Sequence, residues 1–379
     1  MSYLEYTVRR VPSGVRKLAY INWPLVVLIC AVAAFGMLML YSAAGGSLRP
    51  WALAQLQRFA LGMALMFAVA LTPVRIWRDS AFLLYGIGLA LLVAVEFFGT
   101  VGMGAQRWID LGVMRLQPSE LMKIGVILAL ASFYDWLPGE RVSHPLWVGA
   151  ALLLILLPAG LVLRQPDLGT ALLIILAGGA VMFLAGVSWL YFGAAIAAGA
   201  GAVAAVFLSR GTEWQVLKDY QYRRIDTFLD PSSDPLGAGY HITQSMIALG
   251  SGGWDGRGFL QGTQSRLNFL PEKQTDFIFT SLAEEFGFVG GISLLMLYVG
   301  IVVLCMGAGL AHRDRFSALL THGLTVNFFL YFAVNMAMVM GLAPVVGVPL
   351  PLVSYGGSAM LVLLIGFGLI QSAHVHRPR

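Results

Sequence analysis

The 379-residue sequence predicts an all-α protein that crosses a membrane about ten times. Three observations predict this fold class: the composition, the long apolar runs, and the distribution of basic residues among the loops. Hydrophobic residues make up 58% of the chain and charged residues only 11%, whereas soluble domains are typically about 45–50% apolar and about 25% charged. The composition therefore excludes an ordinary soluble enzyme, and the abundant aromatic residues and long apolar runs exclude a disordered chain.

Ten apolar runs are long enough to be transmembrane helices, because a helix needs about 20 apolar residues to cross the hydrocarbon core. They are residues 22–42, 55–72, 80–99, 118–137, 145–164, 168–187, 189–209, 277–309, 315–342 and 352–373, with ends uncertain by a few residues. The first run is too long for the apolar part of a cleavable signal peptide. Residues 171–209 are almost continuously apolar, and we place the break between the sixth and seventh spans near Gly186.

The basic residues predict the orientation of the chain. They gather in alternate loops and at both chain ends, at Arg9, Arg10, Arg16, Lys17, Arg75, Arg78, Arg141, Arg313, Arg315, Arg377 and Arg379. An even number of spans places all of these on one side, which the excess of positive charge identifies as the cytoplasm. We therefore expect both termini to be cytoplasmic, with an N-terminal segment at 1–21 and a tail at 374–379. The net charge of +5 is scattered rather than clustered, which argues against nucleic-acid binding.

Residues 210–276 form the only long polar stretch, and the number of spans places this loop outside the cytoplasm, between spans seven and eight. A loop of this length in a compact protein is usually functional or disordered, and its aromatic and apolar residues favour function. Residues 241–249 have an amphipathic pattern that is typical of a helix lying along the membrane interface. The sequence shows no matched pair of broken helices, which weakens the interpretation as an inverted-repeat transporter.

Several ionisable residues lie where spans begin, and such residues are costly in a membrane and usually functional. Glu120 and Lys123 follow Gln117 and Pro118 and share one face of span four. The alternative is a self-neutralising pair that only holds helices together. Asp167 begins span six, where the helix dipole favours an acid and where a simple N-terminal cap is the alternative role.

The stretch 253–287 is the richest in polar groups, and Asp276 lies where the chain re-enters the membrane from outside. A carboxylate at this half-desolvated boundary is suited to act as a general base, although Thr275 or Asp276 could merely cap the helix. Glu284 and Glu285 lie deeper and need either partners or a water-filled cleft. The prolines and paired glycines of 341–358 exclude a regular helix there, and such backbone is tolerated in a membrane only where protein buries it or it lines a cavity.

These motifs together resemble the SEDS family (shape, elongation, division and sporulation), the RodA/FtsW group. The segment from Asn335 to Ser358 carries the clearest similarity, and stretches 107–108, 117–120, 165–170 and 270–279 are also similar to family motifs. The resemblance covers about residues 22–376, so we expect 1–379 to be a single SEDS membrane domain. Residues 345–353 and 262–265 look more like the RodA branch than the FtsW branch.

The resemblance implies a peptidoglycan glycosyltransferase of the bacterial cytoplasmic (inner) membrane that polymerises lipid II into glycan strands during cell elongation. It implies contact with membrane lipid, a class B penicillin-binding protein (a transpeptidase) as partner, and the elongation machinery around them. An α-linked donor and a β-linked product imply inverting transfer with release of undecaprenyl pyrophosphate. The alternative is a lipid II flippase, which the one-sided distribution of polar residues disfavours. A scaffold that only recruits the penicillin-binding protein would leave the ionisable residues unexplained.

Asp276 matches the family's essential loop acid and is the predicted catalytic base. The predicted binding residues for pyrophosphate or sugar are Arg107, Trp108, Gln117, Glu120, Lys123, Asp167, Arg223, Arg224, Gln264, Glu272, Ser354 and Tyr355. Arg107, Lys123 and either Arg223 or Arg224 are the candidates to neutralise the leaving group. No organic cofactor is expected. A divalent cation, Mg²⁺ or Mn²⁺, is a candidate cofactor, with Glu120 and Asp167 as candidate oxygen ligands.

Overall fold

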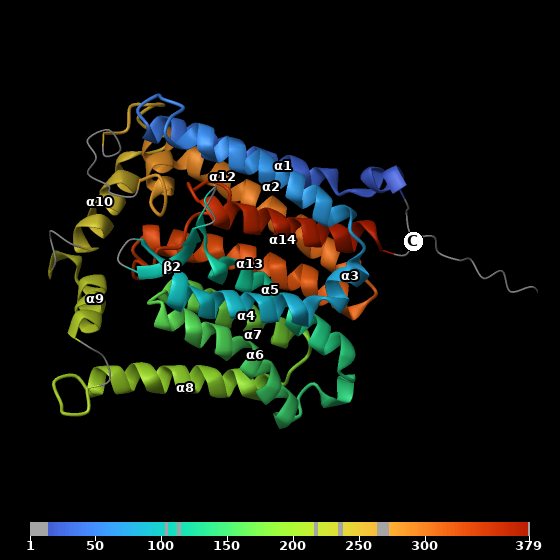
Figure 1. Ribbon diagram of the computed structural model, residues 1–379. Helices are drawn as coiled ribbons and strands as arrows, with labels where there is room; N and C mark the ends of the chain where they lie inside the picture. The colour runs from blue at the N-terminus through green and yellow to red at the C-terminus, as the bar shows by residue number, and fades with distance from the viewer. Residues whose placement is uncertain are drawn as a thin grey trace, which may run out of the picture.

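The computed structural model describes residues 14–102, 105–110, 112, 115–215, 219–233, 238–263 and 273–377. Its long helices lie side by side as a bundle (Figure 1), and ten of them correspond to the ten predicted spans. They are α1 (Trp23–Ala43), α2 (Trp51–Leu71), α4 (Ala81–Phe98), α5 (Pro118–Trp136), α6 (Pro145–Arg164), α7 (Leu168–Leu184), α8 (Trp189–Leu208), α12 (Ile278–Leu310), α13 (Arg315–Val339) and α14 (Gly357–Val375). The predicted polytopic α-helical fold is confirmed.

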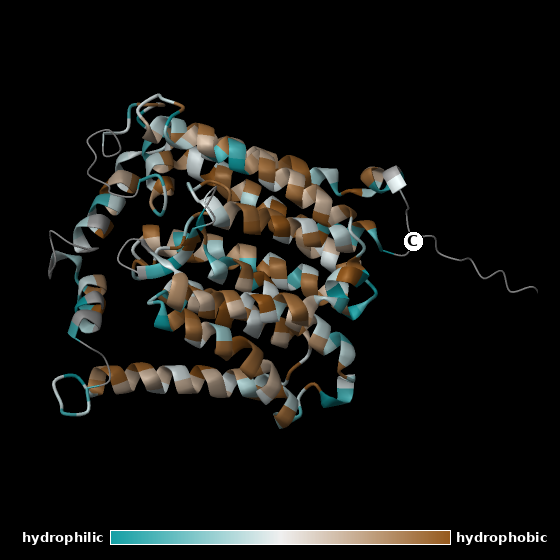
Figure 2. Ribbon diagram, viewed as in Figure 1, coloured by the Kyte–Doolittle hydropathy of each residue, from teal (hydrophilic) through white to brown (hydrophobic). Residues whose placement is uncertain are grey.

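Eight of these helices are long and apolar enough to cross a membrane, and α7 is a shorter apolar helix, within the described ranges. Figure 2 shows hydrophobic residues along the helices of the bundle and hydrophilic residues mainly at its two ends. The described chain ends lie together at one end of the bundle, as an even number of spans requires. We call the opposite end, where the long loop lies, the loop end.

Shorter elements connect the long helices. They are η1 (Gly14–Tyr20), α3 (Val74–Asp79), β1 (Thr100–Gly102), β2 (Ala105–Asp110), β3 (Arg115–Leu116), η2 (Gly139–Arg141), α9 (Asp219–Leu229), η3 (Pro231–Ser233) and α10 (Ala238–Ser251). The three strands form an antiparallel sheet in the order β1-β2-β3, with Thr100 opposite Trp108 and Ile109 opposite Leu116. The prediction contained no strands, so this small sheet between α4 and α5 is a correction to it.

The ends of the helices follow from local sequence. Asn22 caps α1, whose first turn contains Pro24, and Ser188 caps α8. The predicted break between the sixth and seventh spans is present, because α7 ends at Leu184 and Gly186 adopts a positive φ of 95°. A residue other than glycine is strained in that conformation, so glycine allows the chain to reverse here.

The last span begins at Gly357 and not at the predicted residue 352. Pro349 and Pro351 each lack a backbone N–H group, and Leu352 has a positive φ of 63°, so residues 349–356 cannot form helix. Residues 341–356 contain no helix, as predicted, but Gly357 and Ser358, which the prediction also placed outside a helix, begin α14. The second span begins at Trp51, four residues before the predicted start.

Helix α14 lies in the centre of the bundle and packs closely against α2. Gly62 and Gly368 lie in this contact, and a Cβ atom on Gly368 would be only 2.8 Å from the carbonyl oxygen of Met66. Small residues allow helix backbones in a membrane to approach in this way. By contrast, α8 lies apart from the bundle and has no buried side chain.

Candidate functional site

Asp276 lies in a turn, residues 273–277, that leads into α12 at the loop end. Its side chain is half-buried. The N-cap of α12 is Phe277, which makes no side-chain capping hydrogen bond, so the structure does not show Asp276 or Thr275 as the cap of this helix. Partial burial also lowers the pKa of the Lys273 ammonium group, which begins this turn.

Two side chains from distant parts of the sequence fix the backbone beside Asp276. The Asn335 amide donates hydrogen bonds to the carbonyl oxygens of Asp276 and Val348, at 2.9 and 2.7 Å. The Ser354 hydroxyl donates to the Thr275 carbonyl oxygen at 2.5 Å. The turn is therefore joined to the segment between α13 and α14, residues 341–356, which we call the last loop. Protein groups hold its non-helical backbone, as expected for irregular backbone in a membrane.

The last loop also approaches the Asp276 side chain. A Cβ atom on Gly347, which has a positive φ of 69°, would lie 3.6 Å from the Asp276 Oδ2 atom. The Tyr355 N–H group donates to the Gln274 carbonyl oxygen at 2.8 Å. The carboxylate thus faces the last loop and keeps a half-exposed surface, while its backbone is held on both sides.

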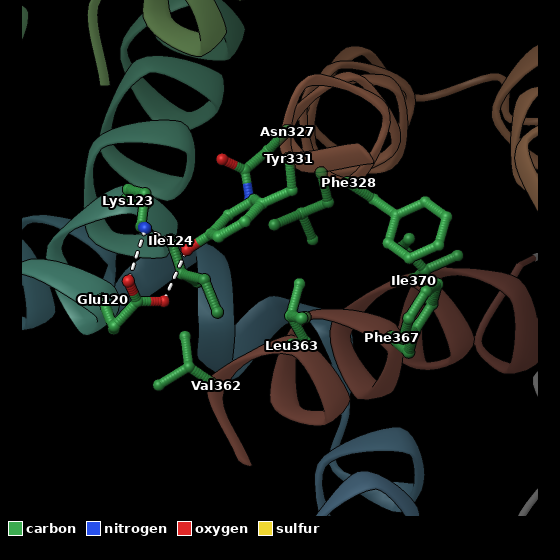
Figure 3. Close-up of a pocket in the computed structure, with 12 residues that line it drawn as sticks. Glu120, Lys123, Ile124, Asn327, Phe328, Tyr331, Val362, Leu363, Phe367 and Ile370 are labelled. Atoms are coloured by element: carbon green, nitrogen blue, oxygen red, sulfur yellow. Dashed lines mark hydrogen bonds and ion pairs between the residues drawn. The ribbon is translucent and has the colours of Figure 1, made fainter. Parts of the chain in front are cut away.

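Glu120, Lys123 and Tyr331 form a buried polar cluster between α5 and α13. Glu120 is 4% exposed and Lys123 is 2% exposed, and their charged groups are 2.7 Å apart. Lys123 donates to the Tyr331 hydroxyl, which donates to Glu120 at 2.5 Å (Figure 3). The predicted pair is present, and a third partner that the sequence analysis did not include satisfies both charges.

Arg107 and Asp167 form a second polar cluster where β2 meets the start of α7. The Arg107 guanidinium donates to the carbonyl oxygens of Gln165 and Pro166 and lies 4.0 Å from the Asp167 carboxylate. Asp167 also caps α7, because it accepts the Thr170 N–H group at 3.1 Å. It therefore has the helix-cap role that the sequence suggested, and it also lies beside the Arg107 guanidinium.

Helix α13 brings these groups into one region. Asn327, Tyr331 and Asn335 are four residues apart and so lie on one face of the helix, with Cβ atoms about 5–6 Å apart from one to the next. Asn335 holds the turn at Asp276, and Tyr331 holds the Glu120–Lys123 pair. A sequence signal for this polar stripe exists, because three polar side chains at this spacing are unusual in a membrane helix.

A small, partly open pocket lies between α5, α13 and α14. Figure 3 shows Glu120 and Lys123 at one side of it and apolar side chains around the rest. Its lining residues are Glu120, Lys123, Ile124, Leu324, Asn327, Phe328, Tyr331, Val362, Leu363, Gly366, Phe367 and Ile370. Asp276 and Arg107 do not line this pocket, so Asp276 is linked to it indirectly, through α13 and through the loop that leads into α14.

Glu284 and Glu285 have protein partners in the preceding loop. Glu284 accepts a hydrogen bond from the Thr263 hydroxyl at 3.0 Å, and Glu285 accepts the Leu260 N–H group at 3.2 Å. The Ser42 hydroxyl also donates to Glu285. These two acids therefore fasten the loop that precedes Asp276 onto α12.

The other predicted site residues have different surroundings. Gln117 donates to Asp167 at 3.1 Å, and Trp108 is half-buried in β2. Ser354 and Tyr355 belong to the last loop described above. Arg223 is exposed on α9. The side chain of Arg224, and residues Gln264 and Glu272, lie outside the described residues.

The two candidate metal ligands do not fit a resident cation. Both Glu120 oxygens are bound by Lys123 and Tyr331, and Asp167 is engaged by Thr170, Gln117 and Arg107. No group of three or more His, Cys, Asp or Glu residues that could hold a metal ion exists among the described residues. We therefore assign no catalytic step to a protein-bound metal.

Sequence comparison identifies related proteins. The model of the FtsW, RodA and SpoVE family, described as "Cell cycle protein", matches residues 22–379. Peptidoglycan glycosyltransferase MrdB of Escherichia coli (strain K12) is 48% identical over 285 residues, which cover 75% of this chain and 74% of the relative. Peptidoglycan glycosyltransferase RodA of Treponema pallidum is 33% identical over 345 residues, which cover 74% of this chain and 79% of the relative.

Solved structures are similar over nearly the whole chain. One is a chain from a study of how a peptidoglycan synthase complex coordinates polymerization and crosslinking. It has a TM-score of 0.81 and 33% identity, and the match covers 93% of this chain and 97% of that one. The rod shape determining protein RodA of Thermus thermophilus has a TM-score of 0.71 and 29% identity, with 95% and 98% of the two chains covered.

Proposed function

The chain belongs to the FtsW/RodA/SpoVE family as a RodA-like peptidoglycan glycosyltransferase, and we propose that it polymerises lipid II with Asp276 as the general base. The observation that carries this proposal is the attachment of the Asp276 turn. Asn335 and Ser354 hold the backbone at residues 275 and 276, while the carboxylate stays half-exposed. A general base needs such a fixed position and access to the proton that it removes.

The proposed reaction is a single inverting displacement. The Asp276 carboxylate takes the proton of the acceptor sugar's 4-hydroxyl group as that oxygen forms a bond to C1 of the donor. The bond between C1 and the phosphate oxygen breaks, and undecaprenyl pyrophosphate leaves with the electron pair. Attack opposite the leaving group inverts C1, as in inverting glycosidases, where water takes the place of the sugar hydroxyl.

The two buried polar clusters support the site in different ways. Lys123 is bound to Glu120 and Tyr331, so we assign it a positioning role at the wall of the pocket. Arg107 is held by two carbonyl oxygens and Asp167. The Arg107 side chain is 30% exposed and is the better placed of the two to attract a diphosphate.

The lining of the pocket between α5, α13 and α14 supports a role in binding the lipid part of the substrate. Its wall is mainly apolar, with Phe328, Val362 and Phe367 among the lining side chains. An apolar pocket with a few polar groups at one side is typical of a site for an amphipathic ligand. We propose that it receives the first isoprene units of the polyprenyl tail.

The similarity to a synthase complex supports a partner protein. In that complex, polymerization and crosslinking are coordinated. We propose that this chain works beside a class B penicillin-binding protein that crosslinks the new strand in the elongation machinery. The apolar helices and the family support a location in the bacterial inner membrane, with the loop end on the outer side.

The test is polymerisation of lipid II by purified protein in detergent. We expect wild-type protein to form glycan polymer and Asp276→Asn to form none, with an unchanged unfolding temperature. Asp255→Asn, the same change at an exposed acid of the same loop, is the matched control and should keep wild-type activity. Polymer made by Asp276→Asn would contradict the assignment of the base. Absence of polymer from every variant, wild type included, would favour the flippase alternative.

A further inference from the structure

Arg58 is a permanent positive charge inside α2 that forms no ion pair with any residue the structure describes. It is half-buried, and its Nη1 atom is fully buried without a hydrogen-bond partner among the described residues. Arginine remains charged in proteins, and such a charge in a membrane segment is costly unless something binds it.

Arg58 contacts the Tyr355 ring, but this contact leaves its N–H groups without hydrogen-bond acceptors. Its Cζ atom lies 4.7 Å from the centroid of the Tyr355 ring, a cation–π contact. The ring covers one face of the guanidinium and leaves its N–H groups, which lie in the plane of the group, unbound. By contrast, Lys123 donates to a Glu120 carboxylate oxygen, and Arg107 donates to the Gln165 carbonyl oxygen.

A second set of unpaired donors lies beside Arg58. A Cβ atom on Gly357 would be 3.9 Å from both Cζ and Nε of Arg58, so the guanidinium lies against the first turn of α14. The N-cap residue of this 19-residue helix, Gly356, makes no side-chain capping bond. The first N–H groups of a helix lack intrahelical partners and carry partial positive charge. A cation beside them is unfavourable unless an anion binds between them.

Ser358 provides an independent indication of a ligand. It lies in the first turn of α14 and is 1% exposed, yet its hydroxyl has no hydrogen-bond partner among the described residues. Buried hydroxyl groups nearly always have a partner, so an unpaired one usually indicates a missing ligand or water molecule. One kind of ligand would pair all of these donors, namely an anion with several oxygen atoms. It could accept from the Arg58 guanidinium, the first N–H groups of α14 and the Ser358 hydroxyl.

This group of donors adjoins the Asp276 turn. The Tyr355 N–H group donates to Gln274, two residues before Asp276. Gln55, one turn from Arg58 on α2, donates to the Ser354 carbonyl oxygen at 2.8 Å. Val362, one turn further along α14 than Ser358, lines the apolar pocket. An anion at Arg58 would therefore lie close to segments that lead to both the proposed base and the proposed lipid pocket.

We propose that Arg58, together with the first turn of α14, binds the diphosphate of the polyprenyl-linked donor and of the departing carrier. A guanidinium binds phosphate oxygens in a two-point geometry that an ammonium cannot reproduce. This inference rests on the proposed function, because a diphosphate ligand follows from lipid II as the substrate. A phospholipid headgroup shares the phosphate chemistry, and the experiment separates the two.

The first arm of the test is kinetic. Initial rates of polymerisation are measured against lipid II concentration for wild type, Arg58→Gln, Arg58→Lys and Arg75→Gln, an exposed arginine outside the site. We expect KM to rise at least tenfold in Arg58→Gln, to rise less in Arg58→Lys, and to stay unchanged in Arg75→Gln. An unchanged KM in Arg58→Gln would overturn the proposal.

The second arm needs no turnover, so it remains informative if the proposed activity fails. Binding of undecaprenyl pyrophosphate and of phosphatidylglycerol is measured separately by native mass spectrometry. We expect Arg58→Gln to weaken binding of the diphosphate at least tenfold and to leave phosphatidylglycerol binding unchanged. Loss of phosphatidylglycerol binding alone would assign the site to a membrane lipid and overturn the proposal.

The third arm separates ligand binding from a structural role. Removing a buried charge that lacks a partner should leave the unfolding temperature of the ligand-free protein unchanged or raise it. A lower unfolding temperature for both Arg58→Gln and Arg58→Lys would show that Arg58 supports the fold, and would contradict the proposal. Ser358→Ala is the second variant, expected to raise KM without lowering stability.

Discussion

Tyr331 shows how one hydroxyl group makes a buried ion pair tolerable. Two charges removed from water are stable only when further hydrogen bonds satisfy them. The Tyr331 hydroxyl accepts from Lys123 and donates to Glu120, and both charged groups are almost completely buried. The same helix presents Asn335 to the turn at Asp276. Single side chains of α13 therefore determine where the ionisable groups of the site lie.

His312 predicts a specific dependence of stability on pH. Burial in the turn between α12 and α13 lowers its pKa from the ordinary 6.5 to about 4. Asp314 opposes this shift, and His374, Arg377 and His322 each add a smaller lowering. Between these two pH values the unfolded chain binds a proton and the folded chain does not. The free energy of unfolding should therefore fall on acidification, by up to about 1.4 kcal/mol per pH unit.

The measurement is the unfolding temperature in detergent at pH 7 and pH 5. The decrease should be smaller in His312→Gln than in wild type, because glutamine cannot be protonated. His144→Asn, a change at an exposed histidine, should keep the wild-type decrease. Equal decreases in wild type and His312→Gln would show that His312 does not contribute.

Among the elements, α12 is interrupted at Gly287, and the interruption accommodates the loop that precedes Asp276. Gly287 has a φ of 62° and a ψ of −158°, a conformation that is essentially restricted to glycine. A Cβ atom there would lie 2.5 Å from the Trp254 carbonyl oxygen. Glu284 and Glu285, in the turn before this interruption, hold Thr263 and Leu260 of the same loop.

Gly287→Ala should therefore destabilise the protein. Backbone strain alone costs about 1–3 kcal/mol at such a position, and the steric clash with the loop adds to it. We expect a lower unfolding temperature and reduced polymerisation. Gly307→Ala is the matched control, because Gly307 lies in the same helix with open space around its Cα atom and should gain about 0.5–1 kcal/mol. Equal effects of the two substitutions would contradict a special role for the interruption.

Considered as a whole, the molecule carries its polar clusters near one end of the bundle and its basic loops near the other. Arg315, for example, donates to the carbonyl oxygens of Leu137 and Ala185 at the end opposite the long loop. The excess of basic residues at that end predicts that it faces the cytoplasm. The proposed reaction then occurs on the outer side of the membrane.

Reporter fusions test this orientation. Alkaline phosphatase inserted after residue 212 should be active, because the enzyme folds only outside the cytoplasm. The same reporter after residue 377 should be inactive, whereas green fluorescent protein at that position should fluoresce. The reverse pattern would show that the loop end faces the cytoplasm and would contradict the proposed location of the site.

The sequence predicted the spans well because the length of an apolar run can be read from each segment alone, without knowledge of its packing. It also singled out Asp276, Glu120, Lys123 and Asp167 as candidate site residues, since an ionisable residue near a membrane boundary is conspicuous. Tyr331 was missed, because its role depends on packing between α5 and α13 that no local pattern encodes. Arg58 was missed although it is charged, because it lies in a span that was judged by its apolar residues alone.

The hydrogen bonds around Asp276 also constrain how the protein can be made. The chain is synthesised from its N-terminus, so Asp276 is made before Asn335 and Ser354. A nascent chain at that stage contains the acid but lacks the groups that position it. The enzyme should therefore remain inactive until its last two helices are inserted, which would protect the cell from polymerisation by unfinished chains.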